Sequence, residues 1–147
     1  MSTMSHDPNC IFCKIIKGEI PSSKVYENEH VVAFLDISQV TKGHTLVIPK
    51  IHKRDIFELT PEIASNLFAC VPKIANAIKK QFNVDGVNLL NNSGKVAGQT
   101  VFHYHLHILP RYGREDGFHP TFVEHNDQYT PSDLQQIASH IAAGIES

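Results

Sequence analysis

Three histidines at alternating positions are the clearest sign of chemistry in the sequence: His103, His105 and His107. The segment 101–109 has the composition of a β-strand, on which successive side chains point to opposite faces. We therefore expect the three imidazole rings to lie in a row on one face, with apolar side chains on the other. A solvent-facing strand could carry such a pattern, but Thr, Lys or Glu would serve that role equally well.

Strand geometry limits a metal site built from these three rings alone. Alternate residues on a strand are about 6.6 Å apart and the outer two about 13 Å. Zinc, however, holds a histidine nitrogen at about 2.1 Å, so one ion can take at most two neighbouring rings. At least one imidazole would therefore not bind the metal and could have another function. On a phosphate, a neutral ring nitrogen can attack as a nucleophile while a neighbouring ring donates a proton or hydrogen bond.

A glycine-containing loop directly before the histidine strand favours the phosphate interpretation. Gly94 and Gly98 let backbone N–H groups approach an anion, and Gln99 and Thr100 can donate to its oxygens. His44, which opens a strand after a Lys-Gly pair, is a candidate fourth ring of the same site. The alternative is that His44 is a surface or capping histidine with no role in the site.

The cysteines suggest a second kind of site. Cys10 and Cys13 form a C-x-x-C pair, which indicates a metal site or a redox pair in a chain whose first nine residues lack the features of a secretory signal. Any two of the ten histidines could complete a site begun by this pair. Cys70 lies in an apolar stretch and is expected to be a buried thiol.

Composition narrows the class of protein. A chain of 147 residues is about one domain on length, and 41% hydrophobic residues are enough for a real core. The net charge of −2 and a pI near 6.5 argue against a nucleic-acid partner. The longest wholly apolar run, 31–35, is far shorter than the roughly 20 residues of a membrane span. We expect a soluble, cytoplasmic protein.

Hydrophobic periodicity and turn residues predict the elements that position these groups. Helices are expected at about 10–17, at 61–82 with a kink at Pro72, and from Pro131 onwards; strands are expected at 24–27, 31–36, 44–48, 86–91 and 101–109. Pro49 and Pro110 should end the strands before them, because proline lacks the N–H that a ladder needs. Hairpin-joined strands with helices between and after them predict an α+β domain with a mainly antiparallel sheet. Neither a dinucleotide-binding motif nor a P-loop is present.

The run His-Tyr-His-Leu-His-Ile-Leu at 103–109 resembles the signature of the histidine triad (HIT) family, His-φ-His-φ-His-φ-φ. Segments 10–21, 34–38 and 43–52 resemble further segments of that family in the same order, closest to its Hint-like bacterial branch. The resemblance implies a HIT-like fold with a five-stranded sheet that dimerisation extends. It also implies one HIT domain at 10–147, in which about 113–147 form a C-terminal loop and helix, while the polar residues at the start of the chain predict a flexible N-terminus at 1–9.

The resemblance implies a nucleotide hydrolase or transferase that acts at the α-phosphorus of nucleoside phosphoramidates or related purine nucleotides, such as AMP or GMP derivatives. His105 would be the nucleophile of a covalent double displacement that needs no divalent cation. His107 and His44 would contact the phosphate and leaving group, and the main-chain carbonyl of His103 would fix the tautomer of His105. Alternatives are a dinucleoside polyphosphate hydrolase, a nucleotide- or zinc-binding adaptor with little turnover, and a zinc hydrolase with His103 and His105 on the metal.

Substrate-binding residues carried over by the resemblance fall into three groups. Asn92, Gln99 and Thr100 would meet phosphate oxygens or the leaving group, and Asp36 would bind the ribose hydroxyls. The apolar walls of the base site would be Phe12, Phe34 and Ile37, for which a plain core role is the alternative.

The same resemblance selects four metal ligands: Cys10, Cys13, His52 and His103. They would form a tetrahedral structural zinc site that ties the N-terminal helix to the sheet; reduced cysteines without metal are the alternative. Relatives also imply a homodimer. The histidines of the C-terminal region, His119, His125 and His140, are expected at the surface, with a tail that reaches a neighbouring active site as the alternative.

Overall fold

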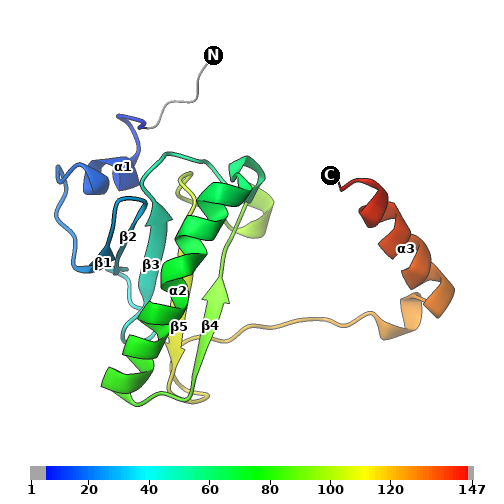
Figure 1. The fold of residues 1–147 in the computed structure, drawn as a ribbon. Coiled ribbons are helices and arrows are strands. Elements are labelled where there is room, and N and C mark those ends of the chain that lie inside the picture. The colour runs from blue at the N-terminus through cyan, green and yellow to red at the C-terminus, as the bar shows by residue number, and fades with distance from the viewer. Residues whose placement is uncertain (1–5, 146–147) are drawn as a thin grey trace.

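The computed structural model describes residues 6–145 and consists of an antiparallel sheet with three α-helices (Figure 1). The sheet has the strand order β1-β2-β3-β5-β4, with antiparallel pairing throughout. The strands are β1 Lys24–Glu27, β2 Val31–Leu35, β3 Thr45–Pro49, β4 Gly86–Leu90 and β5 Leu106–Arg111; the helices are α1 Ile11–Ile16, α2 Pro61–Phe82 and α3 Pro131–Ala143. The predicted α+β class with a five-stranded antiparallel sheet is confirmed. Of the predicted N-terminal segment 1–9, residues 1–5 lie outside the described residues.

Both faces of the central strands are covered. On one face, α2 lies across the sheet (Figure 1), and Leu67, Val71 and Ile74 pack against Val47 and Ile108. The second core cluster brings α1 together with the alternate residues of β2 and β3: Phe12, Ile15, Val32, Phe34, Leu46 and Ile48. A strand buried on both faces needs apolar residues at consecutive positions, which explains the unbroken apolar run of β2.

The two helices that cover the sheet begin and end where their capping residues allow. Cys10 is the N-cap of α1, with its thiol accepting from the N–H of Cys13. Thr60 caps α2 in the same way. Asn83, in the left-handed conformation at φ 55°, follows the last turn of α2. The helix continues through Pro72, so the prediction of one helix is confirmed.

The predicted strand ends at the two prolines were wrong. β3 includes Pro49 and β5 includes Pro110. Pro49 pairs with β2 and Pro110 with β4, whereas the β3–β5 register runs only from Thr45–Ile108 to Val47–Leu106. Each proline therefore stands where one side of its strand has no ladder partner, so the missing N–H costs no hydrogen bond.

The start of the histidine strand was also predicted wrongly. β5 begins at Leu106, so His103 and His105 precede the strand and only His107 lies on it. The main chain of this segment bonds elsewhere: the Tyr104 N–H donates to the Lys53 carbonyl, and the His105 carbonyl accepts from the Asn91 side chain. These bonds take the place of ladder pairing for the segment before β5.

The C-terminal helix α3 stands away from the sheet at the end of an extended segment (Figure 1). A capping box of Thr130 and Asp133 starts it, as the sequence predicts. Its apolar residues, among them Leu134, Ile137 and Ile141, are exposed. Among residues 6–145, no helix has both the length and the apolar character that crossing a bilayer requires.

Candidate functional site

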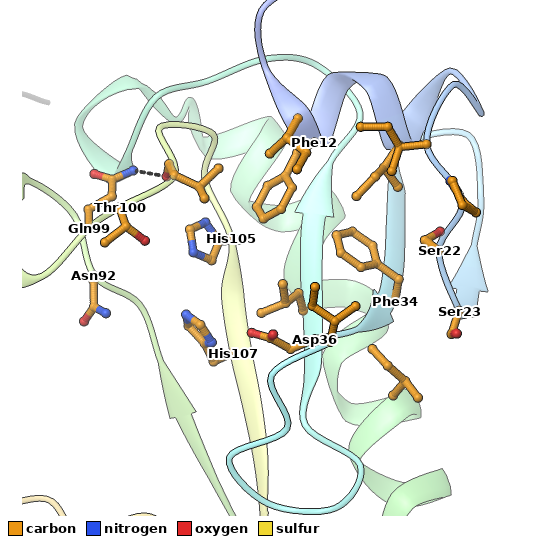
Figure 2. Close-up of a pocket in the computed structure, with 18 of the residues that line it drawn as sticks. Phe12, Ser22, Ser23, Phe34, Asp36, Asn92, Gln99, Thr100, His105 and His107 are labelled. Atoms are coloured by element: carbon orange, nitrogen blue, oxygen red, sulfur yellow. Dashed lines mark hydrogen bonds between the residues drawn. The ribbon is translucent and has the colours of Figure 1, made fainter.

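A cavity of about 550 Å³ lies between α1 and the segment that leads into β5. Figure 2 shows His105 and His107 between an apolar side with Phe12 and Phe34 and a polar side with Asn92 and Thr100. Every residue predicted to bind substrate lines this cavity together with the two histidines: Phe12, Phe34, Asp36, Ile37, Asn92, Gln99 and Thr100. The four separated sequence segments that carry these residues therefore meet at one place.

His105 is held with one ring nitrogen committed. Its Nδ1 lies 2.8 Å from the carbonyl oxygen of His103, and because a carbonyl can only accept, Nδ1 carries the proton. In the neutral ring Nε2 then holds a lone pair. Burial lowers the pKa of His105 from its usual 6.5, which favours this neutral form. The side chain is 7% exposed and lines the cavity, so a neutral nitrogen base is available there.

His107 and His44 form a hydrogen-bonded pair. The Val40 N–H donates to Nδ1 of His44 at 3.3 Å, so the proton of a neutral His44 ring is on Nε2. That Nε2 lies 2.9 Å from Nδ1 of His107, which accepts. Nε2 of a neutral His107 consequently carries a proton. His105 and His107 rings are 5.0 Å apart between centroids, so an acceptor and a donor of different tautomers stand side by side.

Burial controls the charge of this pair. It lowers the pKa of His107 to about 4, with further lowering by the neighbouring His105 and His44. Burial also lowers the pKa of His44, against the opposing effect of the Asp36 carboxylate, whose Oδ2 is 3.7 Å from Nε2 of His44. Both rings are neutral near pH 7. His44 is 2% exposed and stands behind His107 rather than lining the cavity.

Gln99 has its whole amide bonded to the main chain. Its Oε1 accepts from the Gly94 N–H at 2.8 Å, and its Nε2 donates to the carbonyls of Arg54 at 2.7 Å and Val101 at 3.0 Å. These bonds close the glycine loop, in which Gly94 and Gly98 have φ near 95°, a conformation that favours glycine. The predicted phosphate contact of Gln99 remains a prediction, whereas its bracing of the loop is observed. Thr100 beside it is exposed.

The apolar wall belongs to the core and to the cavity at once. Phe12 and Phe34 meet edge to face at 5.6 Å between centroids, and both are buried in the α1 cluster. Ile37 is fully exposed at the rim. Asp36 follows β2 and accepts from the Ser38 N–H through Oδ1 at 2.8 Å. The core role and the wall role proposed for the two phenylalanines are therefore compatible.

A second group of chemical side chains lies next to the cavity: Cys10, Cys13, His52 and His103. Nδ1 of His103 is 3.4 Å from Sγ of Cys10 and 3.6 Å from Sγ of Cys13. Nδ1 of His52 is 3.4 Å from Sγ of Cys13 and 3.2 Å from Nδ1 of His103. These four residues are close enough to bind one metal ion.

The distances fit a tetrahedral zinc ion. Zn–N bonds of about 2.05 Å and Zn–S bonds of about 2.3 Å place two nitrogens about 3.3 Å apart and a nitrogen and a sulfur about 3.6 Å apart. The tautomer fits as well, since Nε2 of His103 donates to the Pro49 carbonyl at 2.8 Å and leaves Nδ1 free to bind. N–H groups of Cys13 and Asp7 point at the sulfurs of Cys10 and Cys13.

The structure separates the three alternating histidines. The ring of His103 joins the cysteine group and does not line the cavity, while His105 and His107 do. The rings nevertheless keep to one face, as the alternation predicts. Tyr104, Leu106 and Ile108 belong to the core cluster of α2, whereas the rings of His103 and His105 both stand against Phe12 of α1 and the rings of His105 and His107 are 5.0 Å apart.

Sequence reasoning missed Asn91, which donates from Nδ2 to the His105 carbonyl at 2.9 Å. Its Oδ1 accepts from the Ser93 hydroxyl, which in turn accepts from the Ile56 N–H. Ser22 and Ser23, on the segment between α1 and β1, also line the cavity. Bonds from a side chain to a distant main-chain group leave no pattern in the sequence. The only sequence signal for a role of Asn91 was therefore its position next to Asn92, which was predicted to bind substrate.

Comparison with known proteins defines the class. The HIT domain family matches residues 17–114, so the chain belongs to the HIT family. Protein hit of Bacillus subtilis is 62% identical over 139 residues, which are 95% of this chain and 96% of the relative. A HIT family protein from Bacillus anthracis, known from its crystal structure, matches with a TM-score of 0.92 and 68% identity over 95% of this chain and 99% of that one.

Two relatives carry names that describe an activity. Adenosine 5'-monophosphoramidase hnt1 of Schizosaccharomyces pombe is 36% identical over 94% of this chain and 99% of its own length. Adenylylsulfatase HINT3 of Arabidopsis thaliana is 44% identical over 78% of this chain and 57% of its own length. A Zn-bound histidine triad family protein from Mycobacterium smegmatis matches with a TM-score of 0.71 and 36% identity, over 90% of this chain and 97% of that chain.

Proposed function

We propose that this protein is a nucleotide hydrolase or transferase that acts at the α-phosphorus of nucleoside phosphoramidates or related nucleotidyl substrates. One observation carries the proposal: Nδ1 of His105 is bound to the His103 carbonyl, which leaves a neutral Nε2 as the nucleophile in the cavity. The names of the fission yeast and Arabidopsis relatives, an adenosine monophosphoramidase and an adenylylsulfatase, support this substrate class.

The reaction would proceed in two displacements. Nε2 of His105 attacks the α-phosphorus, the bond from phosphorus to the leaving group breaks, and the leaving group departs with the electron pair. The positive charge on the nucleotidyl-imidazole ring is met by the His103 carbonyl at Nδ1. Nε2–H of His107, supported by His44, donates a hydrogen bond to the phosphate or leaving atom, and an amine leaving group takes up its proton from solvent. Water then cleaves the phosphorus–nitrogen bond, which restores His105 and releases the nucleoside monophosphate.

The cavity would orient the nucleotide from both ends. Phe12, Phe34 and Ile37 offer apolar surface for a purine base, and the Asp36 carboxylate can accept from ribose hydroxyls. Asn92 and Thr100 lie on the histidine side, where the phosphate must be. Gln99 would act there through the shape of the glycine loop and, as the resemblance implies, through a phosphate contact. AMP and GMP derivatives are the proposed substrates, with no divalent cation at the phosphate.

We also propose that zinc is the ion for Cys10, Cys13, His52 and His103, with a structural role. The donor set is the Cys₂His₂ set that zinc prefers, and the Zn-bound mycobacterial relative supports it. The bound ion would neutralise two thiolates and join α1 to the sheet. A reduced cysteine pair of this kind suits a reducing compartment, so we propose a cytoplasmic location.

A homodimer is proposed from the C-terminal segment. Ile141 and Ile145 are 65% and 72% exposed, although α3 has an apolar face that should be covered. Packing on a second copy would cover this face, and 10–147 would remain one domain with about 113–147 as its C-terminal loop and helix. β4 is an edge strand through which dimerisation could extend the sheet.

Turnover in EDTA tests the proposed function. Wild type and His105→Ala are compared on adenosine 5'-phosphoramidate and on a diadenosine polyphosphate, and the reaction is quenched in alkali to trap a nucleotidyl adduct for mass spectrometry. The expected result is phosphoramidate turnover by the wild type, an AMP-sized adduct on His105 and no turnover by the variant. Preference for the dinucleotide would favour the polyphosphate hydrolase, and binding without an adduct would favour the adaptor. Equal turnover by both proteins would refute His105 as the nucleophile.

A further inference from the structure

His103 belongs to the metal group and to the nucleophile at the same time. Its ring nitrogen Nδ1 lies among Cys10, Cys13 and His52, and its main-chain carbonyl accepts from Nδ1 of His105. The ring is fully buried and its second nitrogen is bound to the Pro49 carbonyl. The ring cannot turn without breaking that bond, so its position constrains the Cα of His103, which is joined directly to the peptide group that orients His105.

Phe12 forms a second connection between the two groups. It lies between Cys10 and Cys13 on α1, so the same short helix that supplies two sulfurs also supplies this ring. The Phe12 ring stands edge to face with His103 at 5.9 Å and with His105 at 5.2 Å between centroids. A shift of α1 would therefore change the packing against the nucleophile directly.

We propose that the ion held by Cys10, Cys13, His52 and His103 positions the nucleophile His105, so that loss of the ion lowers catalytic turnover while the sheet stays folded. The proposal rests on the proposed function and adds a role for the metal group in it. His52 is a positioning residue in this arrangement. It contacts Cys13 and His103 but does not line the cavity, so its effect on His105 must pass through the ion and His103.

Two other hydrogen bonds hold the same segment and could position His105 without the ion. The Tyr104 N–H donates to the Lys53 carbonyl, and the Asn91 side chain donates to the His105 carbonyl. The Tyr104 N–H belongs to the same planar peptide group as the His103 carbonyl, so its bond to Lys53 helps to orient that carbonyl as well. If these two bonds are sufficient alone, His105 will be unaffected by loss of the ion. If they are not, a displacement of about 1 Å at the nucleophile would lower kcat by up to about 100-fold.

The test compares three variants with the wild type. His52→Ala removes one ligand, and His52→Cys replaces it with another zinc ligand. Cys70→Ser changes a buried thiol of α2 and serves as the control for lost stability, since Cys70 belongs to the core cluster on the other face of the sheet. Zinc content, kcat, KM and the ring ¹⁵N NMR signals of His105 without substrate are measured for each.

The expected result for His52→Ala is substoichiometric zinc, a kcat at least 10-fold lower with a smaller change in KM, and loss of the hydrogen-bonded Nδ1–H signal of His105. His52→Cys should restore zinc, the signal and kcat to within about 3-fold, and Cys70→Ser should keep all three. A folded, zinc-free His52→Ala protein with the wild-type His105 signal and kcat would overturn the proposal.

A second measurement covers the case in which His52→Ala does not fold. Wild-type protein is stripped with a chelator at low temperature, its fold is followed by circular dichroism, and it is reloaded with one equivalent of zinc. One equivalent avoids filling Asp36, His44 and His107, whose ligand atoms also lie within 4.8 Å of one another. kcat and the His105 signal should fall and recover together, and an unchanged signal after stripping would overturn the proposal. If wild type shows no turnover at all, the proposed function fails, while the NMR signal still decides whether the ion positions His105.

Discussion

Gln99 could act by bracing the glycine loop or by binding the substrate phosphate. Replacing Gln99 with leucine tests which of the two roles it has. The substitution keeps a side chain of similar size but removes the amide that bonds Gly94, Arg54 and Val101. Gln99 itself is 4% exposed, so water cannot fully replace these bonds. If bracing of the loop is the main role, the protein should lose stability even in the absence of substrate.

The magnitude follows from the three bonds. Each hydrogen bond contributes about 0.5–1.5 kcal/mol net, and the three partners are partly exposed, so Gln99→Leu should cost about 2–4 kcal/mol. For a chain of this length about 1 kcal/mol moves Tm by roughly 2–4 °C. The expected decrease is therefore about 5–15 °C. Gln99→Glu keeps an acceptor for the Gly94 N–H but places a carboxylate against two carbonyl oxygens, so it should be at least as unstable.

The assay is thermal unfolding followed by circular dichroism, with phosphoramidate turnover measured well below each Tm. Thr100→Val is the matched control: it removes a polar group from the next position of the same loop, where the side chain is exposed, and should shift Tm by less than about 2 °C. A Gln99→Leu protein with the Tm of the wild type and a strongly raised KM would refute the bracing role and leave the phosphate contact as the function of Gln99.

Three further predictions concern charge, metal and the nucleophile's main chain. Because burial lowers the pKa of His107 to about 4, the unfolded chain binds a proton more readily than the folded one, so the free energy of unfolding should fall as pH decreases from about 6.5 to about 4. Urea unfolding at pH 7 and pH 5 measures this dependence, which should be weaker in His107→Phe; no pH dependence in the wild type, or an equally steep one in His107→Phe, would contradict the prediction. Cys10→Ser should lose most of the zinc measured by inductively coupled plasma spectrometry, whereas full retention would refute the ligand set. Asn91→Leu removes the bond to the His105 carbonyl and should lower kcat by roughly 10-fold with zinc retained, while an unchanged kcat would show that this bond does not position His105.

Most elements could be predicted because each depends on local sequence. The N-cap of α2 at Thr60, the apolar runs of β2 and β3, and the capping box of α3 are short-range signals that the structure follows. The prolines show where local rules fail, since Pro49 and Pro110 are tolerated only because neighbouring strands end early. The position of α3 away from the sheet could not be predicted, because the apolar periodicity of a helix does not specify which chain covers it.

The residues of the cavity were predictable through the family resemblance, and the alternation of His103, His105 and His107 with apolar residues was predictable from the sequence. The start of β5 at Leu106 was not predictable. The bonds that replace ladder pairing before it come from Lys53 and Asn91, which are distant in sequence. Long-range bonds between a side chain and the main chain are decided by the assembled fold, so no spacing rule reveals them.

Main-chain groups give these histidines their different chemistry. His103 donates through Nε2 to the Pro49 carbonyl, which leaves Nδ1 for a metal. His105 donates through Nδ1 to the His103 carbonyl, which leaves Nε2 for attack. The Val40 N–H donates to Nδ1 of His44, which makes His44 a donor to its neighbour His107. Because burial keeps His44, His103 and His105 neutral, each ring has only one proton, and the backbone decides which nitrogen carries it. Under the proposed function, identical side chains would therefore serve as a ligand, a nucleophile and a donor without any change in residue type.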